Sequence, residues 1–352
     1  MVRDVAVIGA GISGLTLARA LRAAGRSAVV LERSRGVGGR CATRRIDGQP
    51  VDHGVAFLHG RDPRFLAELD AVAGAAPHRG WPCVIQGHGV PCQPEAFDPS
   101  ESRVAFREGV SRLAKHLAQG TDVWLNTRVT RLRPGAGAAG WPAATVDIEL
   151  ETGESLAARA VALALPVPQA NRLLEPLAAE SRAVAEIRPL LGLVQMAACA
   201  TVIARYPAGT PRPAWDVCYP ETVHAVHSVF HDSAKRGEGA VLTLVVQARP
   251  AWSLSALGQA PERWAEELLG EAAETAGGWV ARPAAFQTHF WRHARVHRAS
   301  ELAAPVLLAL ENGAGLGFCG DGFHVAAGLE GAYLSGLALA NKLAARPAAG
   351  EA

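Results

Sequence analysis

The alternation of apolar and polar positions near the start of the chain predicts a strand, a helix and a second strand. Val5 to Ile8 is a continuous apolar run bounded by glycines, as expected for a strand buried on both faces. Ile12 to Ala24 carries apolar residues at helical spacing, and Gly25 follows as a C-terminal cap. Ser27 to Leu31 is again rich in apolar residues. The opening is therefore a βαβ unit.

Similar patterns predict the remaining elements of the chain. The next predicted elements are a glycine- and arginine-rich loop at 36–45, a strand at 51–57, a helix at 65–73, a hairpin-like segment at 77–99, a helix at 109–118, a strand at 123–132, a loop at 134–142 and strands at 144–150 and 155–164. Longer strands are expected at 192–203 and 240–247, a helix at 261–276, and a final strand at 316–319 before a helix at 328–344.

The order of these elements predicts an α/β chain of two domains. We expect a discontinuous Rossmann-type FAD-binding domain from residues 1–75, 104–185 and 287–346, with a GR2-like topology similar to that of p-hydroxybenzoate hydroxylase. Residues 76–103 and 186–286 are expected to form an α+β substrate domain on a mixed or antiparallel sheet. A length of 352 residues suits two domains of ordinary size.

Composition narrows the class of protein. Hydrophobic residues make up 49% of the chain and the formal net charge is only +2, which disfavours disorder and nucleic-acid binding. Six cysteines lie without CxxC pairs, as expected of reduced thiols. The first strand leaves no room for a signal peptide, and the longest apolar stretch, 190–204, is shorter than a membrane span. We therefore expect a cytoplasmic protein without a membrane partner; the oligomeric state stays open.

The first glycine-rich turn has the pattern GxGxxG directly after a strand and before a helix. Gly9 permits the tight turn, Gly11 lets the backbone approach a pyrophosphate, and Gly14 lets the helix pack on the strand. The helix N-terminus, with Ile12 and Ser13, offers unpaired N–H groups to phosphates. Glu32 ends the second strand, where a carboxylate binds ribose hydroxyls. Together these features predict a dinucleotide site.

Two further motifs favour FAD over NAD. A second glycine loop follows Glu32, and an arginine there can neutralise a phosphate. Near the C-terminus a carboxylate at a strand end can bind ribityl hydroxyls, and a glycine-opened helix can direct its positive end at the flavin. The candidate residues in these motifs are Arg33, Gly38, Gly39, Arg40, Gly320, Asp321, Gly328, Glu330, Gly331 and Ala332.

These motifs resemble those of the flavin amine oxidase superfamily, and most closely its renalase-type branch. The resemblance is carried by RGVGGRCATRR followed by DHG, and by GFCGDGF with GLEGAYLSG near the C-terminus. It implies that the backbone of Val129 binds the adenine edge. It also implies an oxidase that converts dihydronicotinamide isomers of NAD(P)H to NAD(P)+ through FAD, with O2 reduced to H2O2.

The resemblance also sets limits on the cofactor and the chemistry. The cysteine that binds flavin covalently in some relatives has no counterpart, since Cys319 precedes Gly-Asp on a strand, so we expect non-covalent FAD. The lysine typical of amine oxidases is not expected either, because Lys115, Lys235 and Lys342 do not lie in apolar strands. An amine oxidase or desaturase of a secondary metabolite, and a non-catalytic FAD-binding protein, remain alternatives.

Several residues are candidates for contact with the flavin or substrate. His53 replaces an apolar residue after Asp52 and is a substrate contact, a proton acceptor with a pKa near neutrality, or a structural histidine. His289 and Trp291 share a face if their segment is a strand, and are candidate walls of a pocket for a planar ring; a plain core tryptophan is the alternative. Phe323 and His324 follow Asp321 and are expected to face the flavin ring.

The remaining histidines do not form a metal motif. His289, His293 and His297 have no acidic partner nearby, so we expect no metal site. The roles of His224, His227, His231, His293 and His297 stay open, as does the identity of the substrate.

Overall fold

The computed structural model describes residues 2–72, 77–135 and 144–346. The chain divides into two compact units, and each is described by itself. The first comprises residues 1–39, 113–196 and 295–352, and the second residues 40–112 and 197–294. These ranges differ from the expected domain boundaries. Residues 40–75, 104–112 and 287–294 fall in the second unit and residues 186–196 fall in the first. Among the described residues, none of the helices has the length and hydropathy needed to cross a membrane.

The first unit is built on a sheet with a parallel centre. Its strands are β1 (Arg3–Ile8), β2 (Ala28–Leu31), β9 (Asp122–Trp124), β10 (Val129–Gly135), β11 (Thr145–Leu150), β12 (Ser155–Leu163), β18 (Val306–Ala309) and β19 (Gly315–Phe318). Strands β19, β12, β1, β2 and β9 run parallel, while β11 and β10 extend the sheet as an antiparallel meander and β18 borders β19. This is the expected Rossmann-type arrangement.

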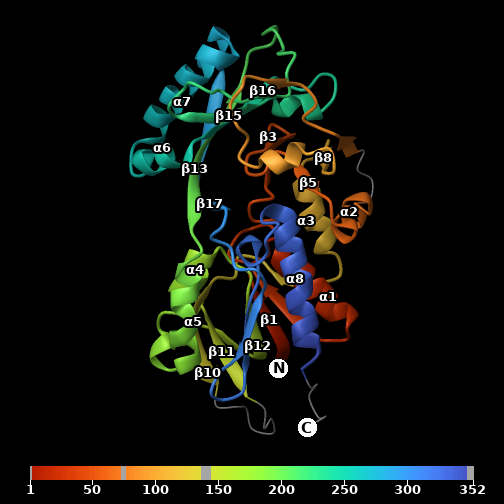
Figure 1. Cartoon of the computed structure of the whole chain (residues 1–352), viewed down its shortest axis with the longest axis vertical. Helices are drawn as coiled ribbons and strands as arrows, with labels where there is room; N and C mark the ends of the chain where they lie inside the picture. The colour runs from red at the N-terminus through yellow and green to blue at the C-terminus, as the bar shows by residue number, and fades with distance from the viewer. Residues whose placement is uncertain (1, 73–76, 136–143, 347–352) are drawn as a thin grey trace. The chain divides into compact units, whose positions relative to one another are not determined.

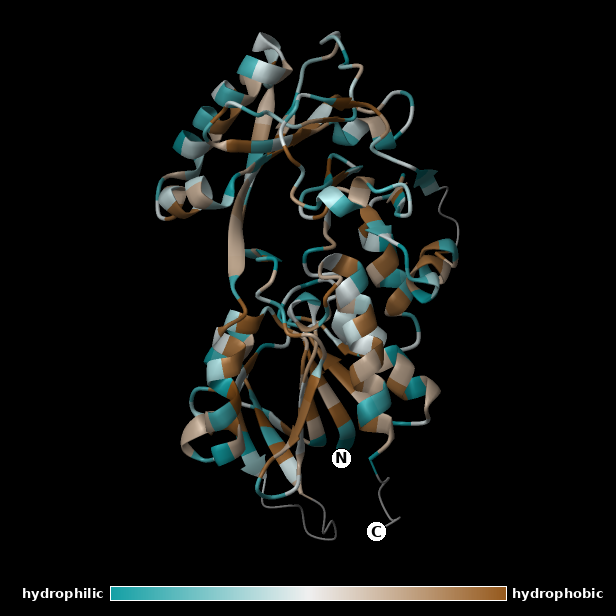
Figure 2. Cartoon of the chain, viewed as in Figure 1, coloured by the Kyte–Doolittle hydropathy of each residue, from teal (hydrophilic) through white to brown (hydrophobic). Residues whose placement is uncertain are grey.

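Helices cover both faces of this sheet. They are α1 (Ile12–Ala23), α4 (Val167–Leu173), α5 (Arg182–Gly192) and α8 (Gly328–Ala344), with α3 (Ser111–Leu117) crossing the boundary between the units. Helix α8 packs along α1 on one face (Figure 1). Residues of α4 and α5 pack on the other face, against alternate residues of β1 and β2. Figure 2 shows brown, hydrophobic stretches along the strands between these helices.

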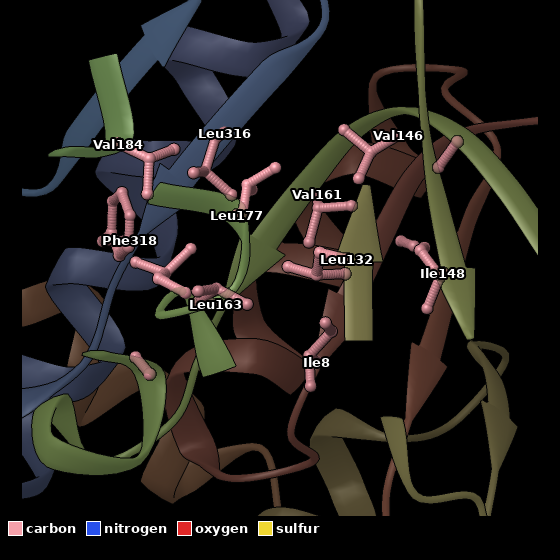
Figure 3. Packing of buried hydrophobic residues seen from close by; sticks show 14 of the residues in the cluster. Ile8, Leu132, Val146, Ile148, Val161, Leu163, Leu177, Val184, Leu316 and Phe318 are labelled. Carbon is pink, nitrogen blue, oxygen red and sulfur yellow. The ribbon is translucent and has the colours of Figure 1, made fainter. Parts of the chain in front are cut away.

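The core of the first unit is aliphatic and joins segments that are far apart in the sequence. Ile8, Leu163 and Phe318 come from three parallel strands, and Val184 and Leu177 come from the segment that follows β12 (Figure 3). The meander contributes its inward residues from β10 and β11. Strand β1 therefore packs against residues from the middle and from the C-terminal part of the chain.

The second unit combines a large sheet with smaller strand pairs. The sheet has the order β17 (Ala285–Val296), β13 (Met196–Arg205), β16 (Thr243–Ala248), β15 (Val226–Phe230), β14 (Val217–Cys218) and β7 (Ile85–Gln86). Strand β7 is parallel to β14 and the other registered pairs are antiparallel, so the sheet is mixed, as expected. The smaller groups are β3 (Thr43–Ile46) with β4 (Gln49–Asp52), and β5 (Leu58–Gly60) with β8 (Ser102–Phe106) and β6 (Pro77–Arg79).

Helices cover one face of this large sheet. Helix α7 (Pro261–Ala276) and helix α6 (Pro250–Ala256) bury Trp264, Leu268 and Trp252 against the strands. Helix α2 (Pro63–Asp70) precedes β6, and short 3-10 helices occur at Pro94–Phe97 and Asp232–Lys235.

Several predicted elements have other bounds in the structure, and the strand predicted at 192–203 begins only at Met196 because α5 extends to Gly192. Three predicted elements differ in kind. The strand expected at 51–57 ends at Asp52, because Asp52 is held by side chains from other segments. The hairpin expected at 77–99 does not form, because β6 pairs with β8 and β7 pairs with β14. The strand expected at 123–132 is two strands, broken where Asn126 adopts a φ of 52°. The expected loop at 134–142 lies mostly outside the described residues.

Candidate functional site

The glycine turn after β1 has the geometry that a dinucleotide needs. A Cβ on Gly9 would lie 2.7 Å from the Ala164 carbonyl oxygen, and one on Gly14 would lie 2.1 Å from the Gly9 carbonyl oxygen. A Cβ on Gly11 would meet no atom within 4 Å, so this position is open. Helix α1 begins there at Ile12 with no side-chain cap among the described residues. Its first N–H groups are therefore directed at the open position.

Glu32 is fixed beside this turn by backbone donors. Its Oε2 accepts a hydrogen bond from the Ala10 N–H at 2.9 Å, and its Oε1 accepts one from the Ser34 N–H at 2.8 Å. Each carboxylate oxygen has two lone pairs, so both retain capacity for ribose hydroxyls. The Thr127 N–H donates to the Glu32 carbonyl at 2.8 Å, which ties the segment before Val129 to the same place. Val129 begins β10 at a register shift.

The second glycine loop lies against the first. The Gly38 N–H donates to the Ala10 carbonyl at 2.8 Å, and Gly11 and Gly38 form a β-bridge. A Cβ on Gly39 would lie 3.6 Å from the Gly11 Cα. Arg33 is exposed beside Glu32, and Arg40 falls in the second unit, where its carbonyl accepts from Val55 N–H.

The C-terminal motif reaches the same edge of the sheet. Strand β19 is parallel to β12 and β1, so its carboxyl end, followed by Asp321, lies at the edge where β1 and β2 also end. Helix α8 approaches the start of α1 so closely that a Cβ on Gly336 would lie 2.4 Å from the Ser13 carbonyl oxygen. Asp321 and Glu330 are both buried here. Gly320, Gly328, Gly331 and Ala332 lie in the same strand-end and helix-start segment.

These features fit an extended flavin dinucleotide. The open position at Gly11 with the α1 N-terminus suits a pyrophosphate, Glu32 suits a ribose, and Asp321 before α8 suits a ribityl chain. The buried Cys319 thiol has its pKa raised to about 12 by burial, which disfavours the reactive thiolate.

A second constellation lies within the second unit. The ring of His53 is 5.1 Å from the ring of His289 and 5.4 Å from that of Trp291, and the last two rings are 4.2 Å apart. The Trp291 Nε1–H donates to the His53 carbonyl at 3.1 Å. Strand β17 places His289 and Trp291 on one face, as the sequence predicts. Arg44 approaches His289 Nδ1 at 3.5 Å.

The histidines of this cluster are held in the uncharged form. Burial, together with the positive charge of Arg44 and repulsion between the His53 and His289 imidazoles when both are protonated, lowers the pKa of His53 to about 4, although Asp52 acts in the opposite direction. Burial and Arg44 also lower the pKa of His289. The expectation of a His53 pKa near neutrality is therefore wrong, because the residue is only 7% exposed and is affected by the positive charge of Arg44. At pH 7 His53 is a weak base.

Beside His53 lies a network of buried charges that was not predicted from the sequence. Lys235 Nζ donates to Asp52 at 2.8 Å and to the Ala56 carbonyl at 2.7 Å, and it also pairs with Asp232 at 2.8 Å. Arg236 contacts both carboxylates, at 2.8 Å and 2.7 Å. Burial alone would raise the pKa of Asp52, but Lys235 and Arg236 bring it below its usual value.

This network, which we call the buried charge cluster (Asp52, Asp232, Lys235 and Arg236), explains two differences from the sequence analysis. It binds the 43–56 segment to the 232–236 segment, which accounts for the place of residues 43–56 in the second unit. From the sequence, Lys235 was not expected to be a buried lysine. In the structure its side chain is fully buried, and its Nζ lies 4.6 Å from the centre of the Trp81 ring. The available signal was the i, i+3, i+4 spacing of Asp232, Lys235 and Arg236.

The other candidate residues are not all brought together. Phe323 is fully buried in the core of the first unit, 6.2 Å from the Phe318 ring, so it is a core residue and does not face a ligand as expected. The turn after Asp321 directs its ring inward. His324 is half-buried, and its Nδ1 accepts a hydrogen bond from the Ala326 N–H.

The remaining histidines have structural partners or surface positions. His227 contacts the Cys92 sulfur at 2.8 Å, and His231 Nδ1 lies 3.3 Å from the Trp215 carbonyl. Burial lowers the pKa of both imidazoles. Within residues 2–72, 77–135 and 144–346, no group of three metal-ligating side chains is found.

Comparison with known proteins identifies the family. Residues 7–71 match the model of an NAD(P)-binding Rossmann-like domain, and residues 71–344 match that of flavin containing amine oxidoreductases. Putrescine oxidase from Kocuria rosea is 43% identical over 68 residues, which is 19% of this chain and 14% of that protein. (S)-6-Hydroxynicotine oxidase from Paenarthrobacter nicotinovorans is 42% identical over 71 residues, 19% of this chain and 17% of that protein. These matches span less than a fifth of either relative.

Solved structures show the same fold over nearly the whole chain. A putrescine oxidase bound to putrescine has a TM-score of 0.69 at 16% identity, covering 98% of this chain and 100% of that chain. A putative protoporphyrinogen oxidase from Exiguobacterium has a TM-score of 0.70 at 13% identity, covering 98% and 99%. The family model matches residues 71–344, which is most of this chain. The chain therefore belongs to the flavin-containing amine oxidoreductases, a family of oxidoreductases whose cofactor is FAD.

Proposed function

We propose that this chain is an FAD-dependent oxidase of the renalase type that acts on a dihydronicotinamide isomer of NAD(P)H or a similar electron-rich ring. The observation that carries the proposal is the cluster of His53, His289 and Trp291 beside Arg44. Its histidines are uncharged at neutral pH and its arginine is positive. Such a surface favours a planar donor that is neutral or anionic and disfavours a protonated diamine.

The chemistry of this donor matches a weakly basic site. When a dihydropyridine loses a hydride it becomes an aromatic cation, so no proton has to be removed in that step. His53, with a pKa of about 4, is not required as a base. FAD, when bound, supplies the hydride acceptor and passes the electrons to O2, which gives H2O2. His53, His289 and Trp291 would orient the donor ring, since the Trp291 N–H is anchored on the His53 carbonyl.

The cofactor is proposed to be bound without a covalent link. The buried Cys319 thiol, with its raised pKa, supports this proposal. All six cysteines are free, which supports the cytoplasm as the location.

Amine oxidation is the second candidate, because the family description and relatives such as putrescine oxidase point to amines. It requires a substrate that reaches the site as a neutral amine, because the positive charge of Arg44 disfavours a protonated one. A third possibility, FAD binding without turnover, predicts a flavin that no donor reduces.

Anaerobic stopped-flow absorbance separates these candidates. Purified yellow protein is mixed in parallel with an equilibrated mixture of NADH isomers, with putrescine and with a neutral cyclic amine. We expect the isomer mixture to bleach the flavin within seconds, and O2 to restore it with formation of H2O2. Bleaching only by an amine would replace the proposal with amine oxidation. A flavin unchanged by all donors would support the non-catalytic alternative.

A further inference from the structure

A row of polar side chains crosses the large sheet of the second unit. In the strand register, Thr201 of β13 and Ser228 of β15 each pair with Gln247 of β16. Directly opposed residues of neighbouring antiparallel strands project to the same face of a sheet. Thr201, Gln247 and Ser228 therefore form one row on one face, which we call the polar row.

The next row of residues on the same face is apolar. Two residues further along the same strands, Ile203, Val245 and Phe230 belong to one hydrophobic cluster, together with Val217 and Tyr219. The polar row itself is buried, with Thr201 and Ser228 at 0% exposure and Gln247 at 9%. Polar groups at this depth are costly unless they are hydrogen-bonded.

Gln247 connects the polar row to the segment that contains His53. Its Nε2 donates to the Gly54 carbonyl at 2.7 Å. The row therefore faces the turn that follows β4, and His53 is the neighbour of Gly54 in the chain. One of the two N–H groups of the Gln247 amide is used in this bond.

Two polar atoms of these residues have no hydrogen-bond partner among the described residues. They are Ser228 Oγ, on the strand next to Gln247, and Nδ1 of His53, the chain neighbour of Gly54, and both are buried from solvent. Thr201 Oγ1 lies 3.7 Å from the Cys199 sulfur, which is a weak contact. A hydroxyl can donate or accept, and a neutral imidazole nitrogen can do either according to its tautomer. Ser228 Oγ and His53 Nδ1 therefore offer both kinds of hydrogen-bonding capacity, which the described residues do not satisfy.

We propose that Ser228, with His53 and Gln247, forms a subsite that hydrogen-bonds a carboxamide on the substrate ring. A primary carboxamide presents an acceptor oxygen and donor N–H groups side by side in the plane of a ring, which matches an unsatisfied hydroxyl and imidazole beside an amide. A carboxylate offers only acceptors, and an acetyl group lacks the donor. The inference rests on the proposed function, because it assigns specificity determinants to the same substrate site.

Binding of nicotinamide tests the subsite independently of turnover. Holoenzyme is titrated with nicotinamide and with 3-acetylpyridine, and the shift of the unfolding temperature and the flavin difference spectrum are recorded. The wild-type protein is expected to bind nicotinamide at least tenfold more tightly than 3-acetylpyridine. Ser228→Ala is expected to lose about tenfold in nicotinamide affinity and to leave 3-acetylpyridine affinity unchanged. Equal affinities of wild type for the two ligands, or an unchanged preference in Ser228→Ala, would overturn the inference.

Ser253→Ala is the matched control for loss of a buried serine hydroxyl. Ser253 is also 0% exposed in this unit, but its Oγ is satisfied by the Ala200 N–H and the Arg249 carbonyl. This control is expected to lower the unfolding temperature and to keep the nicotinamide preference. Ser228→Ala is expected to keep or raise the unfolding temperature of the ligand-free holoenzyme, because it removes an unsatisfied group.

Turnover with dihydropyridine nucleotides that carry a carboxamide, an acetyl or a carboxylate group separates the two proposals. If none of them reduces the wild-type flavin but nicotinamide still binds through Ser228, the proposed function fails and the subsite stands. If all three reduce it with equal kcat/KM in wild type and Ser228→Ala, the proposed function stands and the subsite fails.

Discussion

The two units hold their buried or partly buried carboxylates in different ways. In the first unit, the carboxylate of Glu32 is held by two backbone N–H groups, and the glycine turn leaves its remaining capacity open to a ligand. In the second unit, the carboxylate of Asp52 is enclosed by Lys235 and Arg236 and has no exposed surface in its side chain. One carboxylate is arranged to bind a ligand. The other is arranged to hold Thr43, the Val110 N–H and the 235–236 segment together.

This difference predicts different consequences of mutation. Loss of a member of the backbone-held site removes ligand contacts and leaves the core intact. Loss of a member of the buried charge cluster leaves an uncompensated charge inside the protein, which is the more costly event.

The largest effect on stability is expected for Lys235→Met. A small effect would contradict the difference described between the two units. The variant removes the donor to Asp52, Asp232 and the Ala56 carbonyl, and leaves two carboxylates with one cation. We expect the free energy of unfolding to fall by about 3–5 kcal/mol. Urea denaturation followed by circular dichroism measures it. Lys115→Met, at an exposed position of α3, is the control and should change it by less than about 0.5 kcal/mol; equal curves for the two variants would contradict the role of the cluster.

Glu32→Ala is expected to affect the cofactor rather than the fold. Since hydrogen bonds to a charged group contribute about 1.5–3 kcal/mol each, the dissociation constant for FAD should rise at least roughly tenfold. FAD content after gel filtration and titration of apoprotein with FAD measure the change. Glu175→Ala, at an exposed position of the same unit, serves as the control. Full FAD retention in Glu32→Ala would remove Glu32 from the site.

The pH dependence of stability sharpens the comparison, because it reports on burial of His53. The folded pKa of about 4 lies below the unfolded value of about 6.5, so the unfolded state binds the proton first as pH falls. The contribution of His53 to stability is complete above pH 6.5 and is lost between pH 6.5 and 4, with about 2 kcal/mol lost from pH 7 to pH 5. Urea denaturation at both pH values should show a smaller loss for His53→Gln. An equal loss in both proteins would mean that His53 is not the group responsible.

His53→Met is expected to have the smallest effect of the four on stability and a selective effect on chemistry. Methionine fills the site, and the backbone carbonyl that accepts from Trp291 remains. We expect flavin reduction by the dihydronicotinamide isomers to slow by about tenfold, since orientation of the donor ring is disturbed. Stopped-flow absorbance measures the rate. A rate equal to that of wild type would remove His53 from the residues that contact substrate.

Much of the cofactor region could be predicted because its motifs are each formed by residues close together in the sequence. The GxGxxG turn, Glu32 and helix α8 each depend on a few consecutive residues whose backbone geometry is encoded by glycines and apolar spacing. Helix boundaries at Pro261–Ala276 and Gly328–Ala344 agree with the prediction. The predicted strand at 123–132 failed where one residue, Asn126, adopted a positive φ.

The second unit was less predictable because its important contacts join distant segments. The His53 pKa, the burial of Lys235 and the alignment of Thr201, Gln247 and Ser228 depend on strand register and on which charges are enclosed together. Phe323 shows the same limitation, since a single turn decided whether its ring entered the core.

By itself the sequence determined the dinucleotide fold, the FAD motifs and the strand character of the His289–Trp291 segment. Each of these follows from periodicity or from steric requirements within a short window. Only the tertiary structure decided the charge state of His53, the partners of Lys235 and the face shared by the polar row. Electrostatic energy and hydrogen-bond satisfaction depend on distance and burial in three dimensions, and residues more than a hundred positions apart supply those neighbours.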